Sequence, residues 1–190
     1  MLKIASRLPN LESLYVEDAF EDILPWNCLL KNRCRHSLKK VVCGGRTDLD
    51  FAPHFGTLPV LLKYISKADY LDCLILLMPE CLLRAGISTF QKVRESILAN
   101  YSITKLQIPN HILEEFDRRE SFLQQEGSSS MMIHHHVSRN LKFLSHWCNL
   151  EYDIPDKLLP LVIERVSRCT RGRSALYERI GTFQLSSSIK

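Results

Sequence analysis

The 190-residue chain lacks a long apolar run, and this sets the first limit on its function. Its longest uninterrupted apolar stretch, around 74–78, is far shorter than the roughly 18 residues that a transmembrane helix needs. The opening segment MLKIASRLPN has no apolar core of the kind that secretory signals carry. We therefore expect no membrane-spanning segment and a cytoplasmic or nuclear protein.

A disulfide framework is not indicated either. The chain has 7 cysteines, an odd number, and Cys43, Cys73 and Cys81 lie within or beside apolar segments. Such thiols are typical of reduced, buried side chains in an intracellular protein. With 45% apolar and 24% charged residues, the composition is that of an ordinary globular domain.

Most motifs that carry chemistry are absent from the sequence. It contains no Gly-x-Ser-x-Gly elbow, no His-Glu-x-x-His pair and no Walker-type lysine motif. Gly44-Gly45 lacks the further glycines of a dinucleotide fingerprint and favours a turn that requires positive φ. Asp48, Asp50 and His54 share one polar loop, which is a common chance arrangement. We expect neither enzymatic activity nor a cofactor.

Two clusters contain metal-ligating side chains without the spacing of a metal site. Three successive histidines point in different directions and seldom bind one metal together. The cysteine cluster lacks a pair of cysteines separated by about two to four residues. No metal site is predicted, although the sequence leaves metal binding open for two sets: His134, His135 and His136, and Cys28, Cys34, His36 and Cys43.

The sequence does contain one apolar pattern in four copies. An apolar residue is followed by a second three positions later and by a third two positions after that. The last two positions alternate like the buried face of a short strand. Recurrence of such a unit indicates an array of strand-plus-connection modules. The copies are Leu11-Leu14-Val16, Leu38-Val41-Cys43, Leu71-Leu74-Leu76 and Ile103-Leu106-Ile108.

Helical periodicity lies between and after these copies. Pro59 suits the first turn of a helix over 58–70, and an apolar stripe predicts another helix over 87–99. A charged amphipathic helix is expected over 111–125. Short connections between strand and helix predict parallel pairing. We expect parallel strands near 14–16, 41–43, 72–77 and 103–108.

The four copies and the opening LPNLESLYVED resemble the leucine-rich repeat family, particularly the irregular repeats of F-box-type substrate receptors. The resemblance covers about 8–113 and implies a short irregular solenoid of parallel strands with helices on one side. It also implies a protein-binding role, such as substrate recognition for a ubiquitin ligase. The chain departs from the family where a repeat carries Asn or Cys eight positions after its first Leu. Those positions hold Ala19, Arg46, Pro79 and His111.

A doubly wound parallel sheet is the alternative fold. The second face of the third strand, Cys73, Ile75 and Leu77, is also apolar, as in sheets that helices cover on both sides. The segment from 76 to 109 also resembles the strand–helix–strand portion of N6-adenine DNA methyltransferases. That resemblance implies part of an S-adenosylmethionine-dependent methyltransferase-like α/β domain. The Asn-Pro-Pro-aromatic motif that supplies the chemistry is missing.

The C-terminal third is expected to be less regular. We divide the chain into a leucine-rich-repeat-like α/β array over 1–126, a polar linker or loop over 127–140, and a final part over 141–190. This final part contains a degenerate repeat, LKFLSHWCNL, then a terminal helix and a basic tail. From Arg165 to Lys190 the only acidic residue is Glu178. Such a tail can contact acidic protein surfaces, or nucleic acid less readily because no aromatic stacking pattern accompanies it.

In a solenoid, the outward positions of neighbouring strands form one concave surface for a protein partner. Tyr15 is the expected anchor, because large aromatic side chains dominate such interfaces. Burial of Cys73 and Ile75 under helices of the same chain would exclude this surface. The identity of the partner is not predicted. The predicted protein-binding residues are Tyr15, Glu17, Lys40, Val42, Cys73, Ile75, Lys105 and Gln107.

Overall fold

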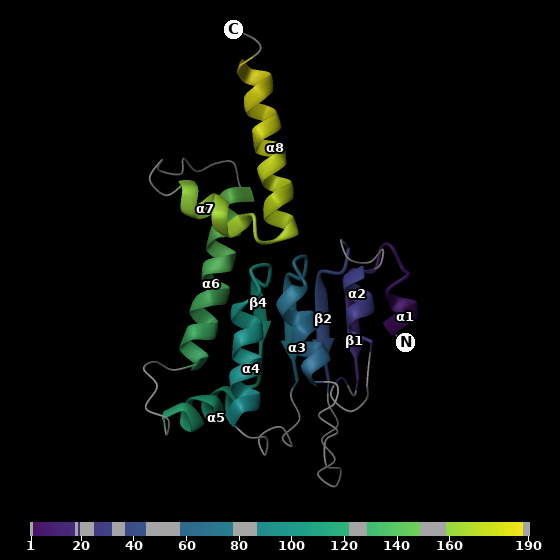
Figure 1. Cartoon of the computed structure of the whole chain (residues 1–190), viewed down its shortest axis with the longest axis vertical. Helices are drawn as coiled ribbons and strands as arrows, with labels where there is room; N and C mark the ends of the chain where they lie inside the picture. Colours follow the sequence, from purple (N-terminus) through teal and green to yellow (C-terminus); the bar gives the residue numbers. More distant parts are fainter. Residues whose placement is uncertain are drawn as a thin grey trace.

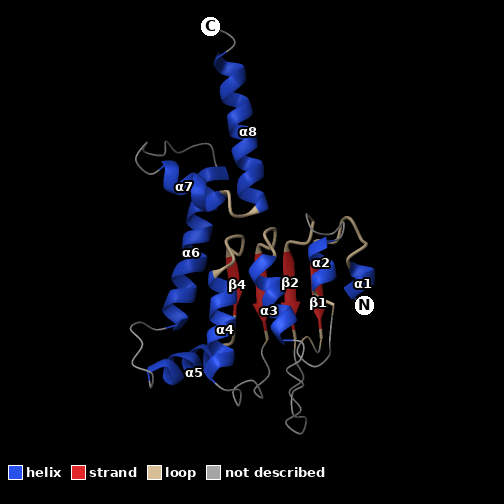
Figure 2. Ribbon diagram, viewed as in Figure 1, coloured by secondary structure: helices blue, strands red, loops and turns tan. Residues whose placement is uncertain are grey.

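The computed structural model describes residues 2–17, 19, 25–31, 37–44, 58–77, 87–121, 129–148 and 159–187. At its centre is a parallel sheet with the strand order β1-β2-β3-β4, so that strands adjacent in sequence are adjacent in space (Figures 1 and 2). The predicted α/β class with parallel strands is confirmed. The strands are β1 (Ser13–Val16), β2 (Lys40–Cys43), β3 (Cys73–Leu76) and β4 (Lys105–Gln107).

Three connecting helices lie over one face of this sheet: α2 (Asn27–Lys31), α3 (Leu58–Lys67) and α4 (Ile87–Leu98) (Figure 1). Neighbours in this layer pack on each other, and α1 (Leu2–Ala5) packs on α2. A doubly wound sheet reverses its strand order at a switch point. The order found here has no reversal, so the doubly wound alternative does not describe this sheet.

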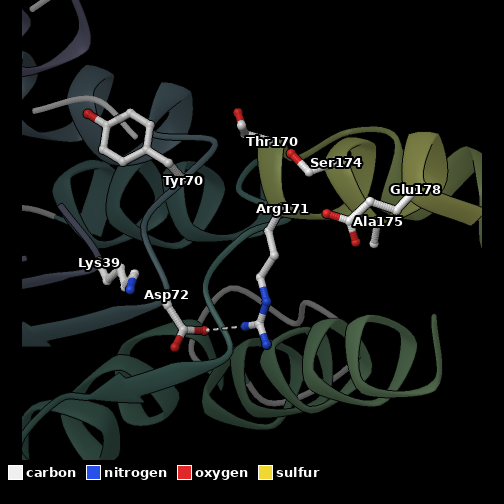
Figure 3. Close-up of a pocket in the computed structure, with 8 residues that line it drawn as sticks. All are labelled: Lys39, Tyr70, Asp72, Thr170, Arg171, Ser174, Ala175 and Glu178. Atoms are coloured by element: carbon white, nitrogen blue, oxygen red, sulfur yellow. Dashed lines mark hydrogen bonds and ion pairs between the residues drawn. The ribbon is translucent and has the colours of Figure 1, made fainter. Parts of the chain in front are cut away.

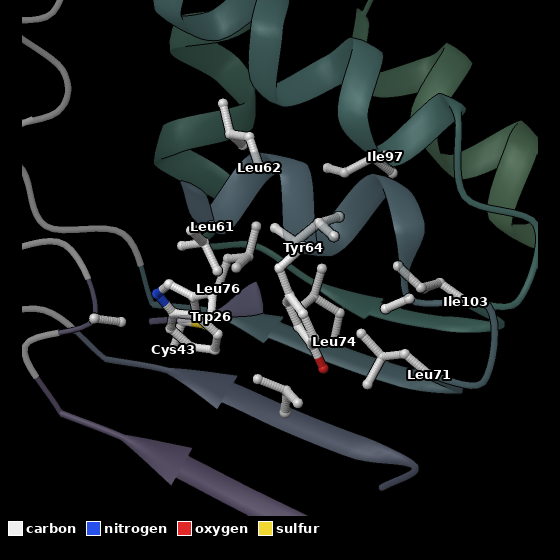
Figure 4. Close-up of a cluster of buried hydrophobic side chains, with 14 of the residues drawn as sticks. Trp26, Cys43, Leu61, Leu62, Tyr64, Leu71, Leu74, Leu76, Ile97 and Ile103 are labelled. Atoms are coloured by element: carbon white, nitrogen blue, oxygen red, sulfur yellow. The ribbon is translucent and has the colours of Figure 1, made fainter. Parts of the chain in front are cut away.

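Burial alternates along the strands and places the core between the sheet and these helices. In β1 and β3 every second residue is buried, and the residues between are exposed or half-buried. This is the alternation predicted from the apolar pattern. Trp26 and Tyr64 are fully buried above the sheet, with ring centroids 5.3 Å apart (Figure 4). The core packs around these two rings with Leu61, Leu71, Leu74, Leu76, Ile97 and Ile103.

The start of each strand is held by the same backbone geometry. The carbonyl of Glu12 accepts hydrogen bonds from the N–H groups of Lys39 and Lys40, at 2.9 and 3.0 Å. The carbonyl of Lys39 accepts two bonds from the next module, and the carbonyl of Asp72 does the same for the fourth strand. This recurrence keeps each pair of strands in one register and supports the reading of the four copies as structural repeats.

A hydroxyl group precedes the first apolar residue of three copies and bonds to the preceding module. Ser37 donates to the carbonyl of Leu11 at 3.1 Å, and Ser102 donates to that of Ala68 at 2.7 Å. Tyr70, at the same position of the third copy, donates to the carbonyl of Leu29 at 3.0 Å. These bonds satisfy backbone groups between modules. The sequence pattern did not reveal them.

Asn100 is a buried connector between α3 and β4. Its amide nitrogen donates to the carbonyls of Ile65 at 2.6 Å and Ala68 at 2.9 Å. Its amide oxygen accepts the N–H groups of Ser102 and Ile103. Because a buried carbonyl without a partner is costly, this one side chain closes the end of a helix and the start of a strand together.

The segment after α5 (Asn110–Ser121) differs from the sequence prediction. Over the residues that the structure describes, the predicted linker over 127–140 and the predicted fifth repeat over 141–150 are wrong, because 129–148 form a single helix, α6 (Ser129–Cys148). Asp117 accepts hydrogen bonds from the N–H group and the hydroxyl of Ser130 in the first turn. Buried residues then follow at helical intervals, which explains why the LKFL pattern forms no strand. They are Ile133, Val137, Asn140 and Leu144.

Polar contacts join α6 to the end of the sheet. Asn140 donates to the carbonyls of Asn100 at 3.1 Å and Ile103 at 3.0 Å, and His136 Nε2 lies 2.7 Å from the Asn100 carbonyl. Beyond α6, the helices α7 (Leu159–Val166) and α8 (Thr170–Ser187) form a second, smaller apolar cluster with it. The helix expected in the final part of the chain agrees with α7, and the segment expected to be a basic tail forms α8 over most of its length.

The alternation in β3 can be tested by a pair of adjacent substitutions. Leu74→Ala should lower the free energy of unfolding by about 2–5 kcal/mol, because it opens a cavity in a fully buried position. Ile75→Ala, on the other face of the same strand, should cost clearly less because its side chain is only half-buried. Urea denaturation of both variants measures the difference. Equal losses would contradict a sheet covered on one face only.

The partly buried position of His136 on α6 predicts a dependence of stability on pH. Burial is the main cause that lowers the pKa of His136, with further lowering by Arg165, Arg139 and His135, and the bond to the Asn100 carbonyl opposes it. The unfolded imidazole therefore binds a proton more readily than the folded one. Stability should fall as the pH drops below the ordinary value of 6.5, until the lower folded pKa is reached.

Urea denaturation between about pH 8 and pH 5 measures this fall. His136→Asn should flatten it, whereas the control His135→Asn, at an exposed position next to it, should reduce it only slightly because His135 is the smallest of the causes that lower the pKa of His136. A fall of the same size in His136→Asn would show that other groups cause the pH dependence.

Candidate protein-binding surface

The sheet face opposite the helices consists of side chains in lateral register. Adjacent strands lie about 4.8 Å apart, so residues paired across the sheet touch or nearly touch. One row contains Tyr15, Val42, Ile75 and Gln107, and the row beside it contains Ser13, Lys40, Cys73 and Lys105. Eight residues from four distant segments thus form one surface.

None of the residues on this face that the structure describes is fully buried. Tyr15 is 55% exposed, and Leu77, just beyond β3, is 39% exposed. Val42, Cys73 and Ile75 are half-buried. The described connecting helices α2, α3 and α4 lie on the opposite face and leave Cys73 and Ile75 only half-buried. We call this surface the open sheet face and define it as Ser13, Tyr15, Glu17, Lys40, Val42, Cys73, Ile75, Leu77, Lys105 and Gln107.

Tyr15 lies across the neighbouring strand. A Cβ atom placed on Gly44 would lie 2.9 Å from the Tyr15 hydroxyl and 3.4 Å from its Cζ atom. The sequence predicts a positive φ at this turn, and at Gly44 this prediction is wrong, because its φ lies outside the left-handed region. The small residue instead leaves room for the phenol ring. Gly45, the other residue of that predicted turn, lies outside the described residues.

The open sheet face has an apolar centre and a polar border. Tyr15, Val42 and Ile75 form the centre. Lys40 and Lys105 stand on the side where the strands begin, and both are exposed. Glu17 and Gln107, also exposed, border the opposite side. Protein interfaces have the same arrangement, with apolar and aromatic residues at the core and polar residues at the rim.

The structure places all eight predicted binding residues on this face and adds two that the sequence reasoning missed. Ser13 belongs to the row of Lys40, and Leu77 continues the alternation of Cys73 and Ile75 by one residue. The period of two was the signal that could have found both residues.

The histidine cluster does not form a joint site. His134 and His135 are exposed on α6, while His136 is directed to the Asn100 carbonyl. Successive helix positions point about 100° apart, which explains the separation. The three histidines lie inside α6 and not in the polar linker or loop predicted over 127–140.

The cysteine cluster is described only in part. Cys28 packs beside the core and Cys43 is buried within β2, where burial raises the pKa of its thiol to about 12. Cys34 and His36 lie outside the described residues, as do three residues of the polar loop, Asp48, Asp50 and His54. Among the residues that the structure describes, no three His, Cys, Asp or Glu side chains come together as metal ligands would.

The basic C-terminal segment is engaged with acidic groups of the chain itself. Arg173 pairs with Asp69 at 2.5 Å, and Arg171 pairs with Asp72 at 3.3 Å. The N–H group of Thr170 also donates to the Asp69 carbonyl at 2.7 Å. Two arginines that the sequence suggested for acidic or nucleic-acid partners therefore hold the start of α8 against the sheet.

A polar cavity of about 720 Å³ lies between α8 and the beginnings of the strands (Figure 3). Its walls carry both signs of charge, from Lys39, Asp72, Arg171 and Glu178. Asp72 is already paired with Arg171 and accepts the Thr104 hydroxyl, and Lys39 is paired with Glu12. These pairs neutralise most of the cavity's charge, so it offers less for recognition than the open sheet face.

No protein-family model, curated protein or solved structure matches this chain. In addition, no helix among the described residues has the length and apolar character to cross a bilayer. The function must therefore be inferred from the residues and their arrangement.

The two cysteines at adjacent strands should react at different rates. Cys73 is half-buried on the open sheet face, whereas Cys43 faces the core and its raised pKa leaves very little thiolate. Mild alkylation of the native protein at about pH 8 should therefore label Cys73 before Cys43. Mass spectrometry of the digested protein gives the order. Labelling in the reverse order would contradict an accessible second face.

Proposed function

We propose that this chain is a protein-recognition module that binds its partner through the open sheet face. The observation that carries the proposal is the row Tyr15–Val42–Ile75, an uncovered apolar strip across three strands of a sheet whose other face is packed. Contiguous exposed apolar surface is characteristic of interaction sites.

The architecture that we propose for this function is a short irregular solenoid of the leucine-rich repeat type. Three observations support it: the sequential order of parallel strands, the helices on one face, and the hydrogen bonds that recur at each strand's start. Solenoids need capping elements that cover their terminal repeats. Here α1 packs beside the first module, and α6 contacts both α4 and β4.

Tyr15 is the proposed anchor of the interface. One face of its ring lies against the backbone of Gly44, and the side chain is 55% exposed. A partner that packs on the exposed face would bury a ring whose position is already fixed. Holding a side chain before binding lowers the entropy lost on association. Lys40 and Lys105 would make polar contacts at the border.

A more specific proposal is that the chain recognises substrates for a ubiquitin ligase. This proposal rests on the resemblance of the sequence to F-box-type receptors. The methyltransferase-like alternative gains no support, because those sheets are doubly wound around their cofactor site and this strand order is sequential. A thermal shift on adding S-adenosylmethionine would reopen that alternative.

The proposal predicts the effect of two substitutions on partner binding. Tyr15→Ala and Ile75→Asp should each weaken the affinity for the partner by about 30-fold or more, as expected for the centre of an interface. The partner is first identified by affinity purification, and its binding is then measured by calorimetry. If the ligase role holds, ubiquitin conjugation of that partner in cells should fall with the same substitutions.

Ile4→Asp is the matched control, because Ile4 is 71% exposed and lies on α1, away from the open sheet face. Circular dichroism and urea denaturation verify that the variants are folded. Wild-type affinity in folded Ile75→Asp would refute the proposed surface.

A further inference from the structure

A second cavity, of about 220 Å³, lies between α6, α7 and the loop that leads into β4. It is far from neutral, since three guanidinium groups line it and Glu164 is the only carboxylate among its described residues. We call it the arginine pocket and define it as Tyr101, Arg139, Phe143, Leu161, Glu164, Arg165 and Arg168.

Arg165 is the innermost cation of this pocket. Its Nη2 atom donates to the amide oxygen of Asn140 at 2.9 Å and lies 3.5 Å from His136 Nδ1, and both partners are uncharged groups. Its Nε atom is buried and has no hydrogen-bond partner among the described residues. No carboxylate of the described chain pairs with Arg165, so its charge is not neutralised locally.

Aromatic rings hold the arginines in place. The Arg165 guanidinium lies 5.0 Å from the ring centre of Tyr101 and 5.5 Å from that of Phe143. Arg168 lies 4.7 Å from the Tyr101 ring centre and also donates to its hydroxyl at 2.7 Å. Cation–π contacts of this kind position a guanidinium but leave its positive charge in place.

The charges around Arg165 leave an excess of positive charge in the pocket. Glu164 is already paired with Arg168 at 2.5 Å, so it does not balance Arg165 or Arg139. Burial, together with the positive charges of Arg139 and Arg168, lowers the pKa of Arg165. A cation that is partly removed from water beside two like charges is stabilised by an anion that brings acceptor atoms to it.

We propose that the arginine pocket binds a phosphate group between Arg139, Arg165 and Arg168. Its volume lies below the roughly 300–1,000 Å³ of typical pockets for drug-sized ligands, which fits a single anionic group better than a nucleotide. Leu161, 58% exposed at the wall, would contact an apolar body that carries the anion. This inference does not depend on the open sheet face.

Titration with inorganic phosphate tests the site directly. Low-millimolar phosphate should raise the melting temperature in a saturable manner, while sodium chloride at the same ionic strength should not. Saturation separates binding from the general stabilising effect of phosphate at high concentration. A rise that is equal in chloride, or that never saturates, would overturn the proposal.

Arg139→Gln is the informative variant. It removes one charge from the pocket and should weaken phosphate affinity by about tenfold, the effect of losing one charge-assisted hydrogen bond. Lys142→Gln is the matched control, since Lys142 is an exposed cation three residues further along α6 and does not line the pocket. Equal loss in the two variants would indicate non-specific charge attraction and refute the site.

Arg165→Lys provides a second variant that keeps the charge but removes the planar donor array. Calorimetry should show weaker phosphate binding for it as well, in a protein that still melts cooperatively. The affinities of phenyl phosphate and inorganic phosphate are then compared. This comparison distinguishes a phosphate group attached to an apolar molecule from free phosphate. Tighter binding of phenyl phosphate favours a phosphate attached to an apolar molecule, and equal binding favours free phosphate. If neither compound binds, the proposal is overturned.

Discussion

Parallel pairing of four very short strands in chain order is the constraint on which the rest of the structure depends. Strands of three or four residues cannot be stable alone, so each one needs both its neighbour and a helix over its apolar side. Crossovers between parallel strands are almost always right-handed. Sequential order with one handedness places every connecting helix on the same face, and the second face is left without cover from them.

The alternation of side chains then separates the two roles of each strand. Leu74 and Leu76 contribute to the core, while Cys73 and Ile75, one residue away, contribute to the open sheet face. Folding and recognition are therefore encoded in alternate positions of the same segment. A shift of the register by one residue would exchange the two sets, which explains why the bonds at the carbonyls of Glu12, Lys39 and Asp72 recur.

The sequence predicted the repeated elements well because their information is local. The spacing of apolar residues predicted four parallel strands and the helix over 87–99 within a few residues. The same local information failed at LKFLSHWCNL, since three apolar residues with that spacing fit a strand or one side of a helix. What decided the outcome is the longer series Ile133, Val137 and Leu144, which extends well upstream of the motif.

Contacts between distant segments could not be predicted from the sequence at all. The pairs of Arg173 with Asp69 and of Asn140 with Asn100 join residues from different parts of the chain, and no periodicity marks them. The candidate surface was predictable to the extent that it follows strand alternation. The arginine pocket was not, because its members come from a loop, α6 and the α7 region, and because aromatic partners follow no spacing rule.

The polar contacts between distant segments supplement the apolar packing that joins the C-terminal helices to the rest of the chain. The main core lies between the sheet and its helices, and a separate small cluster holds α6, α7 and α8 together around Leu144, Val162 and Val166. Ile133 and Val137 place α6 in the main core, so this helix belongs to both clusters, and Asn140 and the Arg–Asp pairs add polar contacts to the apolar packing. Directional bonds of this kind fix orientation more than they add stability. Arg171 and Arg173 form the Arg–Asp pairs and lie outside the arginine pocket, whose innermost cation, Arg165, bonds to the same Asn140 that contacts Asn100.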